Sequence, residues 1–133
     1  MEVREGMSQV VLTVGPGHTL REAARMMSEK RVGAAVVLDE EAPGPRILSE
    51  RDILLSLGKG EDPDTERVGD HMSDTVITAT PDWSLERAAS EMAHRGIRHL
   101  VIVDGGHLAG VLSMRDIMRV WTSDGATSAM TPG

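Results

Sequence analysis

The stretch Ile47-Leu48-Ser49-Glu50-Arg51-Asp52-Ile53 occurs a second time, 64 residues later, as Val111-Leu112-Ser113-Met114-Arg115-Asp116-Ile117. Five of the seven positions are identical. In each copy, apolar residues lead into a Ser and an Asp follows three residues on, which is typical of a strand that ends where a helix begins. The Ser or the Asp can cap that helix, because the N–H groups of the first turn have no partner within the helix. Capping alone explains one copy, but two copies with the same spacing indicate a duplicated unit.

The duplication covers nearly the whole chain. At an offset of 65 residues, identical residues recur for twelve further positions of the first copy, namely Val3, Met7, Ser8, Val11, Thr13, Pro16, Leu20, Ala23, Ala24, Met27, Val36 and Asp39. The offset falls to 64 at the opening stretch because the first copy has one extra residue in its turn at 40–45. The sequence therefore predicts a first repeat over residues 1–58 with its core at 10–57, a linker over 59–67, a second repeat over 68–121 and a flexible tail over 122–133.

Each copy predicts the element order strand, helix, strand, strand, helix. First strands are expected at 10–14 and 75–79, and the helices after them should begin behind the N-cap residues Thr19 and Ser84 and end near Arg31 and Gly96. Glu22 completes a capping box in the first copy. Apolar runs at 34–38 and 99–103 predict strands buried on both faces. The predicted fold class is α/β (α+β), built from two β-α-β-β-α units.

Composition excludes several classes of function. The chain of 133 residues has no Cys, which rules out disulfides, thiolate metal sites and cysteine nucleophiles. It has neither an apolar run of membrane-spanning length nor a signal peptide, so we expect a cytoplasmic protein with no membrane role. A net charge of −7, scattered Arg residues and two Trp as the only aromatic residues argue against nucleic-acid binding.

No group of residues predicts catalysis or a metal. The sequence has no nucleophile elbow, P-loop or dinucleotide-binding glycine pattern, so we expect no enzyme and no obligatory cofactor. His18, His71, His94 and His107 lack metal-ligand spacing and are expected at the surface. The acidic linker lacks the ligand pattern of a calcium loop and is expected to be solvated.

The doubled element order, with Val-x-x-x-Met-Ser before the first strand and Ser-x-x-Asp after the third, resembles a pair of cystathionine-β-synthase (CBS) domains, a Bateman module. The resemblance spans about residues 3–121. It implies that the copies pack around a pseudo-twofold axis and form clefts for adenosine-containing ligands such as AMP, ADP, ATP, NAD(H) or S-adenosylmethionine. It also implies a homodimer that acts as a ligand sensor for an unidentified partner protein.

The chemistry of the repeated motif suits such a ligand. A ribose has two neighbouring hydroxyl donors, and an ionised carboxylate accepts strong charge-assisted hydrogen bonds, so Asp52 and Asp116 are the candidate ribose ligands. Ser49 and Ser113 can donate to a phosphate or ribose oxygen, and the adjacent helix N-terminus favours a phosphate. The arginines of the two motifs either reach the same phosphate or pair with a neighbouring carboxylate. The alternative is a ligand-free dimeric scaffold in which the Asp residues only cap helices.

In the CBS family each cleft takes residues from both copies, and the resemblance carries two such sets over to this chain. The first set, cleft A, comprises Ile47, Ser49, Arg51, Asp52, Ile77, Ile97, Arg98 and His99. The second set, cleft B, comprises Leu12, Val32, Gly33, Ala34, Val111, Ser113, Arg115 and Asp116.

The two clefts differ in charge. Because cleft A has Arg98 and His99 where cleft B has Gly33 and Ala34, we expect cleft A to prefer phosphorylated nucleotides and to bind them more tightly. Cleft B should bind more weakly or accept an uncharged adenosyl group. The first copy departs from the family in having Arg46 where a Gly is usual, and this Arg would either crowd cleft A or add a phosphate contact.

Overall fold

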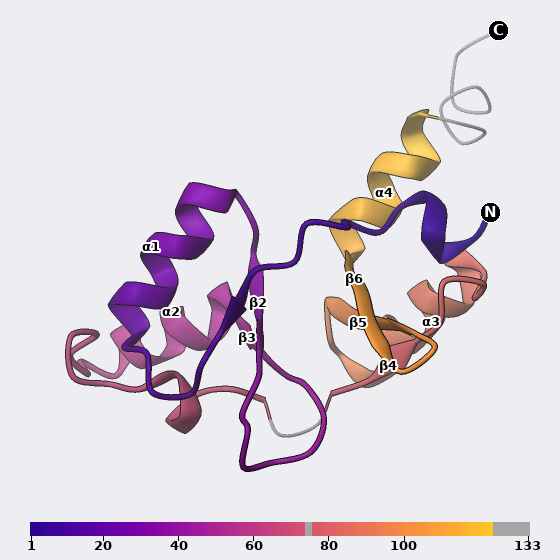
Figure 1. Ribbon diagram of the computed structural model, residues 1–133. Coiled ribbons are helices and arrows are strands. Elements are labelled where there is room, and N and C mark those ends of the chain that lie inside the picture. The colour runs from indigo at the N-terminus through magenta and orange to yellow at the C-terminus, as the bar shows by residue number, and fades with distance from the viewer. Residues whose placement is uncertain (74–75, 124–133) are drawn as a thin grey trace, which may run out of the picture. The chain divides into compact units, whose positions relative to one another are not determined.

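The computed structural model describes residues 1–73 and 76–123, and these form two three-stranded sheets with accompanying helices (Figure 1). The first sheet and its helices are β1 (Thr13–Val14), α1 (Leu20–Lys30), β2 (Ala34–Val37), β3 (Arg46–Ser49) and α2 (Glu50–Gly58). The second set is β4 (Thr78–Ala79), α3 (Leu85–Arg95), β5 (His99–Asp104), β6 (His107–Ser113) and α4 (Met114–Ser123). Short 3-10 helices, η1 (Val3–Glu5) and η2 (Val68–Asp70), precede the two sets. The predicted α/β class and the doubled β-α-β-β-α order are confirmed.

Both sheets have the same topology. The first strand runs parallel to the second, with Thr13 opposite Val36, and the third strand runs antiparallel to the second, with Ala34 opposite Ser49. In the second sheet the equivalent pairs follow the same pattern. β2 is buried at all four positions, as its apolar run predicts. β1 and β4 are shorter than predicted, because only two residues of each lie in register with the neighbouring strand.

The predicted tail and the start of the predicted strand at 75–79 fall partly outside the described residues. These are positions 124–133 and Thr75. Within the described part of the chain, no helix combines the length and the apolar character needed to cross a bilayer.

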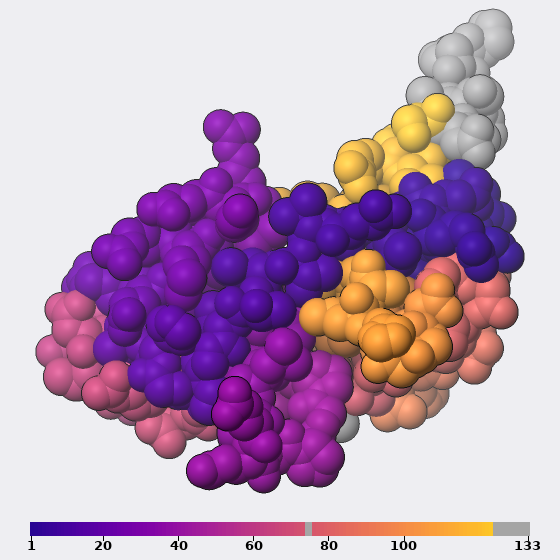
Figure 2. Space-filling model, viewed as in Figure 1, coloured from indigo at the N-terminus to yellow at the C-terminus, as the bar shows by residue number. Residues whose placement is uncertain are grey.

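Two compact units combine the body of one repeat with the leading segment of the other. We call Val11–Val76 the first unit, and Met1–Val10 together with Ile77–Gly133 the second unit. The N-terminal segment lies against the second repeat (Figure 2): Val3 is fully buried, its N–H donates to Trp83 O at 2.8 Å, and Ser8 bridges Val111. In the first unit, Val68 of η2 is likewise fully buried.

Each unit has its own apolar core. The core of the first unit consists of Val14, Leu20, Ala23, Met27, Ala35, Val37, Leu48 and Val68. The core of the second unit consists of Val3, Ala79, Leu85, Ala88, Met92, Leu100, Ile102, Leu112 and Ile117. The helical spacing of the Leu, Ala and Met positions thus places one face of α1 and of α3 in a core, where burial of each large side chain contributes about 1.5–3 kcal/mol.

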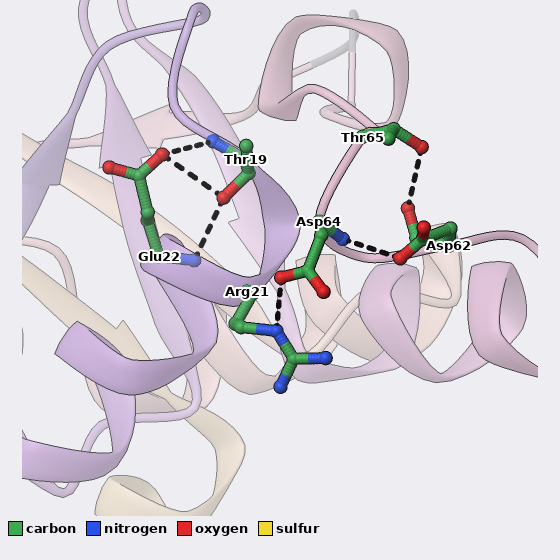
Figure 3. A network of polar contacts seen from close by, with 6 residues as sticks. All are labelled: Thr19, Arg21, Glu22, Asp62, Asp64 and Thr65. Carbon is green, nitrogen blue, oxygen red and sulfur yellow. Dashed lines mark hydrogen bonds and ion pairs between the residues drawn. The ribbon is translucent and has the colours of Figure 1, made fainter.

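Capping fixes where α1 begins, as predicted for Thr19 and Glu22 (Figure 3). Thr19 N donates to Glu22 Oε1 at 3.0 Å, and Glu22 N donates to Thr19 Oγ1 at 3.1 Å. Next to this capping box, Arg21 forms an ion pair with Asp64 of the linker. The linker therefore packs against the start of α1, and its acidic residues Asp62 and Asp64 remain exposed.

We expect the Thr19–Glu22 capping box to make stability depend on pH. Hydrogen bonds from the backbone N–H and the hydroxyl of Thr19 lower the pKa of Glu22 below its ordinary value of 4.5. Since the folded protein binds this proton less tightly than the unfolded chain, the stabilisation is complete above the ordinary pKa and is lost as pH falls through the folded pKa. Glu22→Gln should therefore lower the thermal midpoint more at about pH 7 than at about pH 3. Glu86→Gln, which removes an acidic side chain from the first turn of α3, is the control. If Glu22→Gln lowered the thermal midpoint equally at both pH values, the prediction would be contradicted.

Candidate ligand-binding site

The first Ser-x-x-Asp motif forms the capping box of α2. Ser49 N and Ser49 Oγ donate to Asp52 Oδ2 at 2.8 and 3.0 Å, and Asp52 N donates to Ser49 Oγ at 3.3 Å. Capping therefore occupies only one oxygen of the carboxylate. Among the described residues, none donates a hydrogen bond to Asp52 Oδ1. Asp52 can thus cap its helix and still accept a hydrogen bond from another molecule.

The second motif caps α4 in a similar way but differs at the other carboxylate oxygen. Ser113 N donates to Asp116 Oδ2 at 2.9 Å, and Asp116 N donates to Ser113 Oγ at 3.0 Å. Asp116 Oδ1 accepts a hydrogen bond from Arg119 Nη2 at 3.0 Å, which makes an ion pair within the helix. The equivalent position in the first repeat is Leu55, which has no donor. The two motifs are alike in sequence but unlike in the state of their carboxylates.

In the first unit, the start of the second strand lies beside the motif. Ala34 pairs with Ser49 across the sheet, and Glu50 N donates to Gly33 O at 2.9 Å. The carbonyl oxygen of Leu12, the residue before β1, accepts a hydrogen bond from Val36 N at 2.9 Å. The structure thus brings together, at the end of the sheet where α2 begins, the first-unit residues that the sequence assigns to the two clefts.

The second unit repeats this arrangement. His99 pairs with Ser113, and Met114 N donates to Arg98 O at 2.9 Å. Ile77 O accepts from Val101 N at 3.2 Å, and Ile97 precedes the strand. Cleft A and cleft B each take residues from both units, so the assembly of either complete cleft stays a prediction. The structure gives the geometry of each unit's share of the predicted residues, and we call these shares the two candidate half-sites.

The half-sites differ in charge at the start of the second strand. In the first unit, the carboxylate of Glu50 lies next to Gly33, because a Cβ added to Gly33 would meet the Glu50 carboxylate at 3.3 Å. In the second unit, Arg98 occupies the position of Gly33, and Met114 occupies the position of Glu50. Sequence comparison passed over Glu50 because it is one of the two positions at which the motifs differ. The negative charge of Glu50 in the first unit increases the charge difference from the second unit, which has Arg98 and His99 at this place.

The arginines of the motif and of the strand start have exposed side chains. Arg51, Arg98 and Arg115 all lie at the surface. Backbone groups add to this end of the first unit: among the described residues, the N–H of Arg51 in the first turn of α2 has no acceptor. Such N–H groups at a helix start favour an anion.

Arg46 is directed toward the turn that precedes β3. Its Nη1 donates to Pro43 O at 3.2 Å. In the second repeat, the equivalent Gly110 is required by close packing, because a Cβ there would lie 2.6 Å from Ser8 O. The contact with Pro43 gives the side chain a partner in the turn, while both ligand-related possibilities for Arg46 stay predictions.

Among residues 1–73 and 76–123, one group of potential metal ligands lies outside the motifs. Ligand atoms of Glu61, Glu66 and His71 come within 4.8 Å of one another. His71 Nε2 lies 2.8 Å from Glu66 Oε1, and the buried Ser56 donates to Glu61 Oε1 at 2.9 Å. His71 differs from the surface position expected of it, since its side chain is only 16% exposed. These hydrogen bonds join the end of α2 to the linker and η2, and they account for the cluster without a metal.

Comparison with known proteins gives one consistent family. The model of the CBS domain family matches residues 2–59 and 68–123. The CBS domain-containing protein YhcV of Bacillus subtilis (strain 168) is 36% identical over 131 residues, which are 97% of this chain and 92% of that protein. Among solved structures, the hexameric CBS-CP12 protein from bloom-forming cyanobacteria matches with a TM-score of 0.86 and 28% identity, over 99% of this chain and 76% of that one. The CBS domain protein PAE2072 from Pyrobaculum aerophilum, complexed with AMP, matches with a TM-score of 0.78 and 30% identity, over 92% of this chain and 99% of that one.

Proposed function

The chain belongs to the CBS domain family as a tandem pair, and we propose that it is a regulatory module that binds an adenosine-containing ligand through the carboxylates of Asp52 and Asp116. The observation that supports this most directly is the second oxygen of Asp52, which no described residue engages. The AMP complex of a CBS protein that is 30% identical supports the ligand class.

The residues of the first motif fit a ribose. One or both ribose hydroxyls donate to Asp52 Oδ1 while Oδ2 keeps the helix cap, so binding does not require the start of α2 to unfold. Hydrogen bonds to an ionised carboxylate are stronger than those between neutral groups, by roughly a factor of two. The free N–H of Arg51 and the start of α2 suit a phosphate attached to the same ribose.

The two predicted clefts differ in charge, and we therefore propose a different ligand for each. Cleft A combines Asp52 with the half-site of Arg98 and His99, and it suits a phosphorylated nucleotide such as AMP. Cleft B combines Asp116 with the half-site in which Glu50 lies beside Gly33, and a carboxylate at that place repels a phosphate. We therefore propose an uncharged adenosyl group, or a weakly bound nucleotide, for cleft B.

Regulation requires a change that a partner protein can sense. A ligand shifts the balance between two conformations only by the difference in its affinity for them. We propose that ligand occupancy shifts such a balance in a homodimer, and that the protein acts as a sensor rather than as an enzyme. Apolar side chains exposed on α2 and α4 support the dimer, among them Leu54 at 68% and Met118 at 53% exposed.

AMP is expected to raise the thermal midpoint of the protein. A ligand that binds only the folded state stabilises it by about 2.7 kcal/mol at 100 times its dissociation constant, which corresponds to a shift of several degrees. The measurement is a thermal unfolding curve with increasing AMP, with GMP as the control for recognition of the base.

The alternative function is a ligand-free dimeric scaffold. The capping boxes favour it to some degree, because both Asp residues already have a structural role. If AMP, ADP, ATP, NAD(H) and S-adenosylmethionine all left the thermal midpoint unchanged, the scaffold would be the better account.

A further inference from the structure

We propose that Arg119 is an internal competitor for the carboxylate of Asp116, so that the second motif is held in a low-affinity state which the first motif lacks. This inference deepens the proposed function and rests on it. It starts from a contact within the second unit: Arg119 Nη2 donates to Asp116 Oδ1 at 3.0 Å. Since Oδ2 of the same carboxylate accepts from Ser113 N, both oxygens have a partner.

The first motif provides an internal comparison. Asp52 uses Oδ2 for its cap in the same way, and its Oδ1 accepts no hydrogen bond from the described residues. The repeat places Leu55 where the second copy has Arg119. A leucine can neither donate to the carboxylate nor offset its charge. The difference between the motifs therefore follows from one residue, three positions after each Asp.

A second contact holds Arg119 in place. Its Nη2 also lies 3.4 Å from Gly6 O of the N-terminal segment. A residue larger than Gly at position 6 would crowd α4, because a Cβ there would meet Val120 at 3.1 Å. The N-terminal segment thus lies close along α4, and the guanidinium is placed between its carbonyl and the carboxylate. The same nitrogen, Nη2, makes both contacts, so the bond to Gly6 O is compatible with the ion pair to Asp116.

The ion pair weakens the carboxylate as a ribose acceptor in two ways. It takes one acceptor position on Oδ1, and it offsets the negative charge that makes hydrogen bonds to a carboxylate strong. The side chain of Arg119 is 65% exposed, so the competition is modest and sensitive to salt. A ligand must displace or share this contact at Asp116, whereas it meets no such contact at Asp52.

The test measures the binding affinity of adenosine. Adenosine has no phosphate, so removing the positive charge of Arg119 does not also remove an attraction to the ligand. In an Asp52→Asn background, in which binding at the first motif is weakened, Arg119→Leu should tighten adenosine binding at the second motif by about two- to fivefold. Isothermal titration calorimetry gives the affinity. The gain should shrink between about 0.05 M and about 0.5 M salt, because screening weakens the ion pair that the substitution removes.

Arg95→Leu is the matched control. It removes one positive charge and one exposed ion pair, with Glu91, from α3, and it should leave the affinity unchanged. The reverse substitution tests the same idea in the first motif: Leu55→Arg in an Asp116→Asn background should weaken adenosine binding by a similar factor, while Leu55→Met, which adds neither a charge nor an N–H donor, should not. This second variant keeps the proposal testable if Arg119→Leu fails to fold.

The outcomes separate the two proposals. If the unsubstituted protein binds neither adenosine nor any of AMP, ADP, ATP, NAD(H) and S-adenosylmethionine, the proposed function fails, and the role of Arg119 fails with it. If the unsubstituted protein binds but Arg119→Leu leaves adenosine affinity unchanged or weakens it, the role of Arg119 alone is overturned. A gain that does not depend on salt would also overturn it, since it would point to packing rather than charge.

Discussion

Asp52→Asn is expected to weaken AMP binding by about tenfold to a hundredfold, and by more than Asp116→Asn does. Hydrogen bonds to charged groups contribute about 1.5–3 kcal/mol, and each 1.4 kcal/mol corresponds to a factor of ten in affinity. The larger effect is assigned to Asp52 because its Oδ1 has no partner among the described residues and because its predicted cleft includes Arg98 and His99. Asp116 Oδ1 is already paired with Arg119, so in the unsubstituted protein Asp116 is expected to contribute less to AMP affinity than Asp52 does.

Asparagine is chosen because it separates ligand binding from capping. Its side-chain oxygen can still accept the hydrogen bond from Ser49 N. Asp52→Ala, in contrast, removes the carboxylate half of the capping box and leaves only the bond from the N–H of residue 52 to Ser49 Oγ, so it should also lower stability, by up to about 1 kcal/mol. Calorimetry with AMP measures the affinities, and circular dichroism confirms that each variant is folded. A larger loss of affinity for Asp116→Asn than for Asp52→Asn would contradict the asymmetry between the two motifs.

The sequence predicts most of the fold because its local signals and its repeat agree. The predicted ends of the first helices at Arg31 and Gly96 coincide with C-caps in the left-handed conformation, with φ of 57° and 66°. The N-caps Thr19 and Ser84 are likewise confirmed. The central strands are buried at 34–37 and at 100–102, whereas Leu38, which the apolar run predicts to be buried, lies beyond β2 and is exposed. Each of these features depends on residues close together in the chain, where spacing and side-chain chemistry are sufficient evidence.

The repeat could not predict which unit each leading segment joins. The segments share Val3 with Val68, Met7 with Met72 and Ser8 with Ser73, so either sheet offers an equivalent place for either segment. In the structure, Ser8 bridges Val111 and Ser73 bridges Ile47, which assigns each segment to the body of the other repeat. The identical residues determine which contacts a leading segment makes. Chain connectivity and packing determine which of the two repeats it makes them with.

The state of each carboxylate also depends on details that a motif does not contain. Ser-x-x-Asp predicts a cap in both copies, and both caps are present. Whether the second oxygen is available depends on the side chain three residues later and on its rotamer. The charge at the start of the second strand depends on Glu50, a position at which the copies differ. Residues that the copies do not share therefore distinguish the two half-sites.

Leu54→Lys combined with Met118→Lys is expected to convert a dimer into a monomer and to weaken association at least a hundredfold. The two residues occupy equivalent positions of α2 and α4, and each helix exposes a second apolar residue three positions later, Leu57 at 47% and Trp121 at 38%. Residues three apart lie on one face of a helix, so each helix presents an apolar pair to solvent. An isologous dimer uses the same surface on both subunits, so each of the two substitutions would place charge in the interface twice.

The dimer prediction is tested by sedimentation equilibrium over a range of protein concentrations. Burying an unpaired charge costs several kcal/mol, which is the reason for the large expected effect. Leu38→Lys is the matched control, because Leu38 is 49% exposed but lies in neither helix, and it should leave the dimer intact. A monomeric unsubstituted protein, or a double variant that remains dimeric, would contradict the prediction. If the variant is monomeric and still binds AMP with unchanged affinity, a single chain is sufficient for ligand binding. The dimer would then serve to pass the conformational change on to the partner protein.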